Sequence, residues 1–341
     1  MSGPGGNTAK VDKRAEDWFR ERTSRWQDWS PSWLLERKKR SGTSISVVIP
    51  ARNEQETVGR VVAGLRAALM DGIPLVDELV VIDSDSEDMT AAVAAGAGAV
   101  VHAAREVAAA LGAYPGKGDA LWKSLFVTSG ELLVFIDADL TSWGPHFVTG
   151  LLGPLLANDN VLLVKGFYQR VRTERGRATS AQGGRVTELV ARPLLSMWWP
   201  ELAGVVQPLA GEWSIRRSLI ESLSIPVGYG IEMSTLLDTS ARYGMDSIAQ
   251  VDLDRRAHKH QSDHDLALMA AELLLVAERR KAGAGKEPSA RTLNQFIRRQ
   301  GQARPLSRPV PSHERPPVCS IRHRAESQGK RMNTSQPFSG S

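Results

Sequence analysis

Apolar and polar positions along the chain form blocks that predict strands followed by helices. Three largely apolar runs predict strands at residues 45–50, 79–82 and 132–136, and the last of them is continuous and apolar, as is typical of a buried strand in a parallel sheet. A shorter run at residues 99–102 predicts another strand, and residues 58–69 carry apolar side chains at helical spacing. Strands and helices that alternate at these lengths predict an α/β fold with a right-handed, mostly parallel central sheet.

The most informative polar positions follow the third long apolar run, where Asp137 and Asp139 flank one alanine. Ligands of open α/β sheets bind at the edge where the strands end. Two carboxylates at that edge suit a hard divalent cation that also contacts a diphosphate. An Asp-x-Asp pattern is common by chance and also fits a capped turn at a strand end, so its weight depends on the motifs around it.

Polar loops follow the other predicted strands as well. Asp83 and Ser84 end the second strand and open a turn that suits the start of a helix. Residues 115–121 form a glycine loop around Lys117 that leads into another helix. Its ammonium and backbone N–H groups can meet a phosphate or a nucleobase carbonyl, although the same sequence also fits an ordinary loop. The spacing differs from that of a P-loop, which disfavours an ATPase.

Six ordered sequence words resemble the GT-A glycosyltransferases, and more specifically the glucosyl-3-phosphoglycerate synthases of the actinobacterial type. Within residues 29–275 they read VIPARNE (48–54), VIDS (81–84), PGKG (115–118), GGRVTELVARP (183–193), PVGYGIE (226–232) and RAH (256–258). Six words with matching gaps are far more specific than any one of them. The resemblance implies a GT-A fold, with a Rossmann-like, mostly parallel central sheet and an acceptor-binding C-terminal half.

The same resemblance implies a metal-dependent, retaining glucosyltransferase. The expected reaction moves glucose from an NDP-glucose, with UDP-glucose favoured, to 3-phosphoglycerate. Other donors or acceptors stay open, as in a mannosyl-3-phosphoglycerate synthase or a polyprenyl-phosphate glycosyltransferase, and so does a non-catalytic nucleotide-sugar-binding protein. For transfer with retention, the favoured route is front-side attack by the acceptor hydroxyl, which the leaving diphosphate helps to deprotonate. The alternative is a route in which Glu232 acts as nucleophile. Asp137 and Asp139 share one turn, which does not fit the flanking carboxylates of a hydrolase.

The family's donor and metal residues carry over by position. Asp139 and His258 are the expected ligands of Mg²⁺ or Mn²⁺, Asp137 contacts the ribose or completes the metal shell, and Asp139 and Glu232 are the catalytic candidates. Two positions depart from the family, since Asp85 stands where a glycine is common and Arg52 where an apolar residue is usual. The nucleotide sugar is expected at Pro50, Ala51, Glu54, Asp83, Ser84, Lys117, Asp137, Tyr229 and Glu232.

The acceptor is expected in the second half of the chain. The double glycine at 183–184 precedes an apolar helical stretch at 189–199, so backbone N–H groups, a helix start and an arginine come together there. A double glycine otherwise serves as a flexible turn. Related chains often have an asparagine two residues after the metal histidine, whereas this chain has His260. The acceptor residues implied are Gly184, Arg185, Val186, Thr187 and His260.

Composition localises the charge of the chain. With 341 residues, 42% of them hydrophobic, it can bury a sizeable core. Its net charge of +5 suggests nucleic acid at first, but residues 279–341 hold fourteen Lys or Arg and three Asp or Glu. Those residues carry +11, which leaves −6 on residues 1–278. The mildly acidic body therefore excludes nucleic acid as the expected partner.

We expect four parts: a flexible N-terminal extension (1–28), a nucleotide-sugar-binding half (29–160), an acceptor-binding half (161–278) and a basic disordered tail (279–341). The tryptophans at 18, 26, 29 and 33 fit an interaction helix or packing against the protein's own sheet. No apolar run approaches a membrane span and the single Cys319 cannot form an internal disulfide, so a soluble, cytoplasmic protein is expected. A homodimer is also expected, and the apolar stretch 266–276 suits a helix for burial or for dimer contact.

Overall fold

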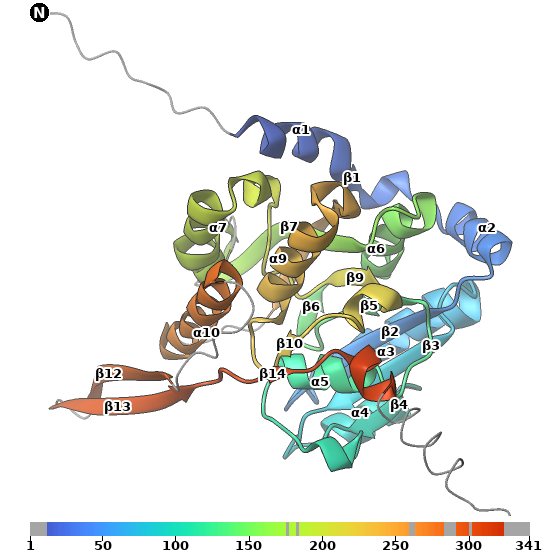
Figure 1. The fold of residues 1–341 in the computed structure, drawn as a ribbon. Coiled ribbons are helices and arrows are strands. Elements are labelled where there is room, and N and C mark those ends of the chain that lie inside the picture. The colour runs from blue at the N-terminus through green and yellow to red at the C-terminus, as the bar shows by residue number, and fades with distance from the viewer. Residues whose placement is uncertain are drawn as a thin grey trace, which may run out of the picture.

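The fold is known from a computed structural model, which describes residues 12–174, 177–181, 184–258, 263–282, 291–299 and 302–323. Within these residues, one large sheet has the strand order β1-β11-β7-β9-β5-β2-β3-β4, with β6 paired to β11 and β8 to β7 (Figure 1). Its strands are β1 (Thr23–Arg25), β2 (Ile45–Ala51), β3 (Glu78–Asp83), β4 (Val100–Ala103), β5 (Leu132–Phe135), β6 (Leu140–Ser142), β7 (Leu163–Glu174), β8 (Arg177–Ala181), β9 (Trp213–Arg216) and β11 (Ile248–His258).

Parallel pairing joins the strands that the apolar runs predicted. Val48 of β2 lies opposite Val80 of β3 on one side and Phe135 of β5 on the other, and Val48 and Phe135 are fully buried. Continuous apolar strands fit this position because both faces of the sheet are covered. β9 enters antiparallel between β5 and β7. The mostly parallel α/β sheet predicted from the sequence is confirmed.

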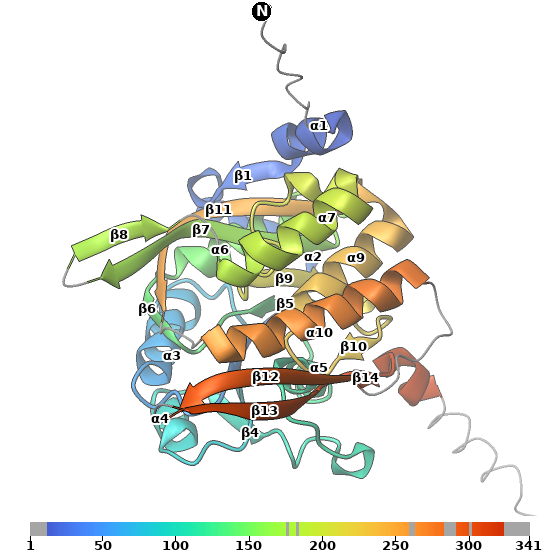
Figure 2. The same ribbon diagram turned by 90° about the vertical axis from the view of Figure 1, so that its left-hand side faces the viewer.

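Helices cover both faces of the sheet (Figure 2). One core contains apolar side chains from α2, α3 and α6, and the other contains side chains from α5, α7, α9 and α10. None of the described helices is long and apolar enough to cross a bilayer. The helices are α1 (Lys13–Arg22), α2 (Pro31–Ser41), α3 (Val58–Arg66), α4 (Thr90–Gly96), α5 (Lys117–Ser124), α6 (His146–Ala157), α7 (Arg192–Trp198), α8 (Arg217–Ile220), α9 (Ile231–Tyr243) and α10 (Asp263–Ala282), and shorter turns are η1 (Trp26–Asp28), η2 (Ala67–Gly72), η3 (Ala109–Leu111), η4 (Thr187–Ala191), η5 (Pro200–Gly204) and η6 (Met245–Ser247).

The N-terminal segment differs from the flexible extension that was expected. Residues 12–28 form α1, β1 and η1, and β1 adds a parallel edge strand to β11. Trp18 is 5% exposed, and its indole N–H donates to the carbonyls of Met245 and Ile248. A buried tryptophan with two acceptors fixes α1 against the sheet. Packing of the tryptophans against the protein's own sheet is the correct alternative, and residues 1–11 lie outside the described residues.

The C-terminal segment also differs from the disordered tail that was expected. After α10, strands β12 (Arg291–Arg299) and β13 (Gln302–Val310) form a hairpin that projects from the body (Figures 1 and 2). β14 (Glu314–Arg315) then pairs with β10 (Ile225–Pro226), and Val318 is fully buried. Specific pairing of this kind cannot be read from a composition rich in Pro, Ser and Arg. Residues 324–341 lie outside the described residues.

The two expected halves share one sheet. β2, β3 and β5 belong to residues 29–160, and β7, β9 and β11 belong to residues 161–278, yet β5 pairs directly with β9. The boundary between a donor half and an acceptor half therefore stays a prediction about function.

Candidate active site

The loops after β2 and β3 lie together at the carboxyl edge of the sheet. Ala51 and Asp83 are opposite each other at the last paired position, and Ser84 N donates to Ala51 O at 2.9 Å. Glu54 N is held by the Thr90 hydroxyl at 2.7 Å. Pro50, the remaining residue predicted here, is the half-buried neighbour of Ala51 in β2. The structure thus brings the residues expected at the nucleoside to one edge.

The departure at Asp85 has a conformational explanation. Its φ is +56°, in the left-handed region where glycine is favoured and where Asp is among the better tolerated alternatives. Its carboxylate pairs with Arg105 at 2.9 Å. Asp85 therefore maintains a backbone turn of the kind that a glycine at this position would favour.

The glycines on either side of Lys117 allow two loops to approach closely. A Cβ on Gly118 would lie 1.8 Å from Pro226 O, and one on Gly116, whose φ is +136°, would lie 2.3 Å from Val227 O. Gly118 N donates to Gly228 O at 3.1 Å. The Gly-Lys-Gly pattern thus seats the start of α5 directly on residues 226–228, a packing role that the sequence analysis did not foresee.

Lys117 joins two carboxylates that are far apart in the sequence. Its Nζ lies 2.7 Å from Asp137 Oδ1 and 2.8 Å from Glu232 Oε1. Burial alone would lower the pKa of Lys117, but the charges of Asp137 and Glu232 outweigh burial and raise that pKa above its ordinary value. Lys117 therefore stays charged in a site that is largely closed to solvent. A fixed ammonium of this kind suits a phosphate.

Arg256 is the second cation of the site. Its Nη2 lies 2.7 Å from Asp137 Oδ2, 3.0 Å from Glu212 Oε1 and 3.5 Å from Asp139 Oδ1. Its Nη1 donates to the Tyr168 hydroxyl at 2.8 Å. Asp137 thus accepts from Lys117 on one oxygen and from Arg256 on the other. This arrangement leaves Asp139 as the carboxylate less engaged by the protein.

Asp139 fits a metal ion. Its Oδ1 is buried without a hydrogen-bond donor, and burial followed by the charge of Asp137 raises the pKa of Asp139 to about 6. A bound divalent cation would supply the missing positive charge. The backbone of His258 in β11 lies opposite Leu140, the residue after Asp139. The His258 side chain lies outside the described part of the chain, within which no group of three His, Cys, Asp or Glu could hold a metal.

Several site residues were missed by the sequence analysis. Arg256 lies in one of the six sequence words but was given no role, and Glu212, which is fully buried, was not among the expected site residues. Burial raises the pKa of Glu212, although the charge of Arg256 acts to lower it. Lys165 in β7 donates to Ala210 O at 2.9 Å, and burial lowers the pKa of Lys165 to about 8. A lysine inside an apolar strand was the signal that could have identified it.

The residues expected at the sugar flank the start of α9. Tyr229 is 41% exposed, whereas Glu232 is buried and faces Lys117. The backbone N–H of Tyr229 donates to Glu272 Oε2 of α10 at 2.6 Å. Burial raises the pKa of Glu272 to about 7, because the bond from Tyr229 only partly offsets it. α10 therefore holds the loop that is expected to face the sugar.

The residues expected at the acceptor form the start of the helical segment that contains η4 and α7. Gly184 O accepts from Glu188 N at 2.9 Å, which closes the first turn. Val186 and Thr187 are buried, and Arg185 is half-buried. The N–H groups at such a start favour an anion. His260 lies outside the described residues, so its position relative to this turn stays a prediction.

Comparison with known proteins gives a consistent picture. A sequence model of the family described as "Glycosyl transferase family 2" matches residues 46–212. A glucosyl-3-phosphoglycerate synthase of Mycolicibacterium smegmatis is 43% identical over 307 residues, which cover 88% of this chain and 99% of that protein. One from Petrotoga mobilis is 39% identical over 292 residues, covering 84% of this chain and 90% of that protein.

A solved structure adds the fold and the bound groups of a relative. The glucosyl-3-phosphoglycerate synthase of Mycobacterium tuberculosis, in complex with Mn²⁺, UDP-glucose and phosphoglyceric acid, aligns with a TM-score of 0.76 and 40% identity. The alignment covers 86% of this chain and 95% of that one. The GT-A fold expected from the sequence is confirmed.

Replacement of Asp139 by Asn should abolish most Mn²⁺ binding, because a neutral amide removes the carboxylate that lacks a donor. We expect affinity to fall at least about 100-fold, as measured by titration calorimetry with Mn²⁺ in the presence of UDP. Asp159→Asn removes a fully exposed carboxylate whose partner is Arg216 and should leave Mn²⁺ affinity unchanged. Equal affinities in the two variants would refute the role of Asp139.

Proposed function

This chain belongs to the glucosyl-3-phosphoglycerate synthases within family 2 of the glycosyl transferases, and on that premise we propose that it transfers glucose from UDP-glucose to 3-phosphoglycerate. The observation that carries the proposal is the cluster of Lys117, Asp137, Asp139 and Glu232 at the carboxyl edge of the sheet. That edge is where α/β sheets bind nucleotides. A relative 40% identical to this chain binds Mn²⁺, UDP-glucose and phosphoglyceric acid.

The donor would bind along the edge formed by β2, β3 and β5. Asp83, 7% exposed with one carboxylate oxygen lacking a donor, can accept from the base or ribose, and Ser84 can bond the uracil edge. Pro50, Ala51 and Glu54 would line the nucleoside beside them. Uracil as the preferred base is a proposal supported by the UDP-glucose found in the relative.

The diphosphate would lie between Lys117 and Asp139. Lys117 supplies a fixed positive charge for the leaving phosphate, and Asp137 keeps that ammonium oriented at 2.7 Å. A Mg²⁺ or Mn²⁺ ion held by Asp139 and His258 would neutralise the charge that grows on the diphosphate when the sugar bond breaks. Mn²⁺ has support from the relative's structure, and Mg²⁺ is a proposal that rests on the same oxygen-rich chemistry.

The glucose would lie against Tyr229 and Glu232. Lys117 holds Glu232 Oε1 at 2.8 Å, which keeps the carboxylate positioned to accept bonds from sugar hydroxyls. An ion-paired carboxylate is a weaker nucleophile, and this supports front-side transfer with retention over attack by Glu232. In that route the leaving diphosphate helps to deprotonate the incoming hydroxyl. The hydroxyl oxygen then bonds to the anomeric carbon on the same face of the sugar from which the diphosphate departs.

The acceptor would bind at the helix start formed by residues 184–187. The two charged groups of 3-phosphoglycerate match the N–H groups of this turn and the guanidinium of Arg185. Val186 and Thr187 are buried, so their role would be through backbone N–H groups and the threonine hydroxyl. His260 would complete the seat as a donor to phosphate. A preference for GDP-mannose in the donor assay would indicate a mannosyl donor. Release that 3-phosphoglycerate does not stimulate would indicate another acceptor, such as a polyprenyl phosphate.

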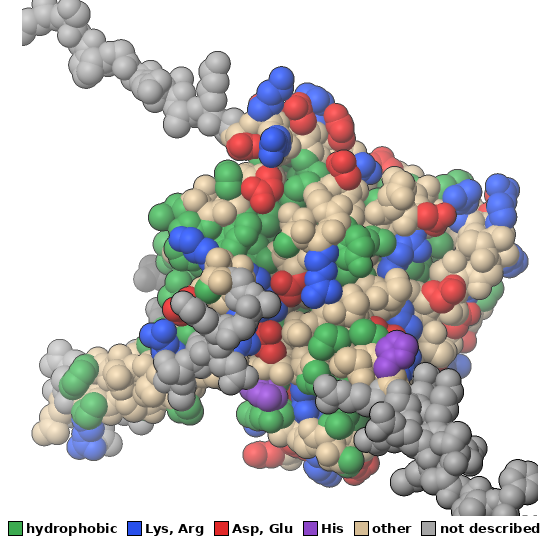
Figure 3. All heavy atoms as spheres, in the orientation of Figure 1, with side chains coloured by type: hydrophobic (Ala, Val, Ile, Leu, Met, Phe, Trp, Pro, Cys, Tyr) green, Lys and Arg blue, Asp and Glu red, His purple; other side chains and the backbone are tan. Residues whose placement is uncertain are grey.

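We also propose a homodimer in the cytoplasm. The β12–β13 hairpin carries five Arg and no Asp or Glu in residues 291–310, whereas residues 1–278 carry −6. Phe296 in the middle of β12 is 78% exposed. Apolar side chains also gather over α7, where Met197 is 72% exposed (Figure 3). A second copy offers both the opposite charge and an apolar partner surface. The cytoplasmic location is supported by the single cysteine alone.

Release of UDP from UDP-glucose in the presence of Mn²⁺ should require 3-phosphoglycerate. GDP-glucose and GDP-mannose should give much slower release, because the base and sugar seats are built for the UDP donor. The assay measures free nucleoside diphosphate with each donor, with and without acceptor, and Asp139→Ala controls for contaminating activity. Release without 3-phosphoglycerate dependence, or a preference for GDP-mannose, would refute the stated reaction.

Replacement of Arg185 by Met should raise the KM for 3-phosphoglycerate by about 10- to 100-fold, since a charged hydrogen bond contributes about 1.5–3 kcal/mol. The dissociation constant for UDP should not change, because the donor lies at the other edge of the site. Arg242→Met, an exposed arginine at the end of α9, serves as the matched control. A change in UDP affinity equal to the change in KM would contradict the assignment to the acceptor.

Replacement of Phe296 by Asp should weaken dimerisation at least about tenfold, because it places a charge in an apolar contact. Sedimentation equilibrium measures the dissociation constant. Tyr243→Asp changes a 52% exposed aromatic residue at the end of α9 and should have no effect. A wild-type chain that is monomeric, or a Phe296 variant that dimerises normally, would refute the hairpin as a dimer contact.

A further inference from the structure

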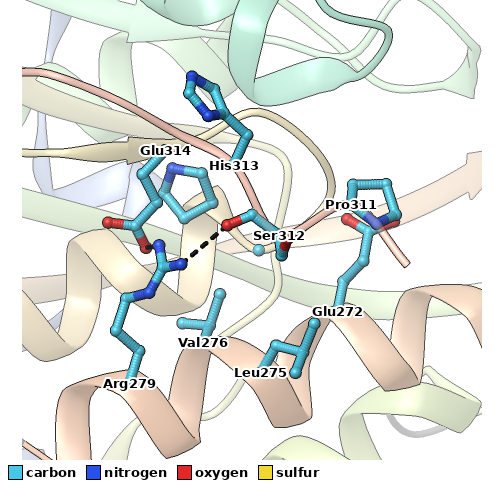
Figure 4. A pocket seen from close by; sticks show the side chains of 10 residues that line it. Glu272, Leu275, Val276, Arg279, Pro311, Ser312, His313 and Glu314 are labelled. Atoms are coloured by element: carbon cyan, nitrogen blue, oxygen red, sulfur yellow. Dashed lines mark hydrogen bonds and ion pairs between the residues drawn. The ribbon is translucent and has the colours of Figure 1, made fainter. Parts of the chain in front are cut away.

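Residues 311–323, here called the C-terminal strap, run from the hairpin along α5 (Figure 1). Arg315 contacts Asp119 near the start of that helix, and Arg322 contacts Leu125 at its end. α10 holds the first part of the strap. Arg279 donates to Ser312 O at 2.8 Å and pairs with Glu314 at 2.7 Å, and the two sides enclose a small pocket (Figure 4). Arg280, which pairs with Asp238 at 2.9 Å, also contacts Glu314. The strap is therefore attached to the helical layer rather than loosely laid over it.

The strap also pairs with the loop that is expected to face the sugar. β14 is antiparallel to β10, and Val227 N donates to His313 O at 3.1 Å. The same loop meets the start of α5, because Asp119 N donates to Val227 O at 2.9 Å. Three segments thus share one set of backbone bonds: the strap, residues 225–228 and the start of α5. A shift in one would be transmitted to the others.

Arg315 is the side chain that joins the strap to α5. It is 3% exposed and lies between the rings of Tyr114 and Trp122, with its guanidinium carbon 4.5 and 4.6 Å from their centroids. Its Nε donates to Asp119 Oδ1 at 2.6 Å. Its two terminal nitrogens donate to Leu111 O at 2.6 Å and Gly112 O at 2.8 Å. All three guanidinium nitrogens are therefore used on the segment 111–119.

The segment 111–119 has an irregular backbone, which the hydrogen bonds from Arg315 hold in place. Gly112 and Gly116 adopt positive φ values of +72° and +136°, so the backbone before α5 is irregular. Asp119 also accepts from Tyr114 N at 3.2 Å. Asp119 therefore links Arg315 to Tyr114 in the middle of the segment. Lys117 stands two residues before Asp119. Its ammonium must keep 2.7 and 2.8 Å contacts with Asp137 and Glu232, which leaves little tolerance for movement of the helix start.

We propose that Arg315 is a positioning residue for donor binding: through Asp119 and the carbonyls of Leu111 and Gly112, it fixes the loop that presents Lys117. The inference rests on the proposed function for the identity of the donor. It also gives the C-terminal strap a role in the active site, although Arg315 itself makes no contact with Asp137, Asp139 or Glu232 among the interactions of the described residues.

The test compares Arg315→Met with Arg322→Met. Arg322 lies on the same strap, but its half-exposed side chain contacts Glu221 and Leu125 O, away from the donor loop. In the presence of Mn²⁺, Arg315→Met should weaken UDP binding at least about tenfold by calorimetry, whereas Arg322→Met should not. The KM for UDP-glucose should rise while the KM for 3-phosphoglycerate stays constant.

Arg315→Lys protects the test against a variant that fails to fold, since it keeps the charge near Asp119 but cannot hold both carbonyls. Its UDP affinity should lie between those of the wild type and Arg315→Met. A purely structural role would lower the melting temperature while leaving UDP affinity unchanged well below that temperature. Unchanged UDP affinity in both Arg315 variants would overturn the proposal.

Hydrogen exchange separates this proposal from the proposed function. Without any ligand, amides in residues 111–119 should exchange faster in Arg315→Met than in Arg322→Met, and equal rates would overturn the role of Arg315 whatever the donor is. In the wild type, UDP and Mn²⁺ at 100 times the dissociation constant should slow exchange in residues 311–316 by up to about 100-fold if strap and loop open together. Unchanged amide exchange in residues 311–316 on UDP binding would count against the proposed link between the strap and the donor loop. A wild type that does not bind UDP would refute the donor assignment instead.

Discussion

The site depends on the balance between buried carboxylates and the cations that hold them. Arg256 contacts three carboxylates, one just before β9 and two in the loop after β5. Lys117 contacts two carboxylates, so that Asp137 is shared by both cations. Charges taken out of water are stable only when each is closely paired. The contact between Arg256 and Asp139 is the longest of these, at 3.5 Å, so the charge of Asp139 is the least compensated by the protein. A metal cation would bind at this carboxylate. The carboxylates concerned are Asp137, Asp139, Glu212 and Glu232.

The framework of the fold could be predicted because its signals are local. The runs at 79–82 and 132–136 are apolar without interruption, and the run at 45–50 has Ser46 as its one polar residue. The carboxylates in the loops after these strands had to meet at one edge of a parallel sheet. Asp137 and Lys117, each given a role in donor binding, are in direct contact. The helix start at residues 184–187 was likewise expected from its glycines, whereas its role as the acceptor site, with His260, stays a prediction.

The remaining parts could not be predicted because the side chains and carbonyls that they contact are distant in the sequence. Glu212 and Lys165 are charged residues whose burial makes sense only once Arg256 and Ala210 O are in place. Arg315 belongs to a segment whose composition suggests disorder, and only its contacts with Asp119 show otherwise. Trp18 likewise is bound by carbonyls of residues 245 and 248. Composition describes the average behaviour of a segment, whereas these contacts depend on single side chains.

The bond between Arg315 and Asp119 spans 196 positions of the chain, and β1 pairs with β11 over a similar distance. Such contacts close large loops, which slows folding. During synthesis, the first half of the sheet emerges long before the strap leaves the ribosome. The nascent chain can therefore pair β2, β3 and β5 early, but the loop around Lys117 is held by Arg315 only after the strap has been made. Lys117 is thus made 198 positions before Arg315, the residue that holds its loop.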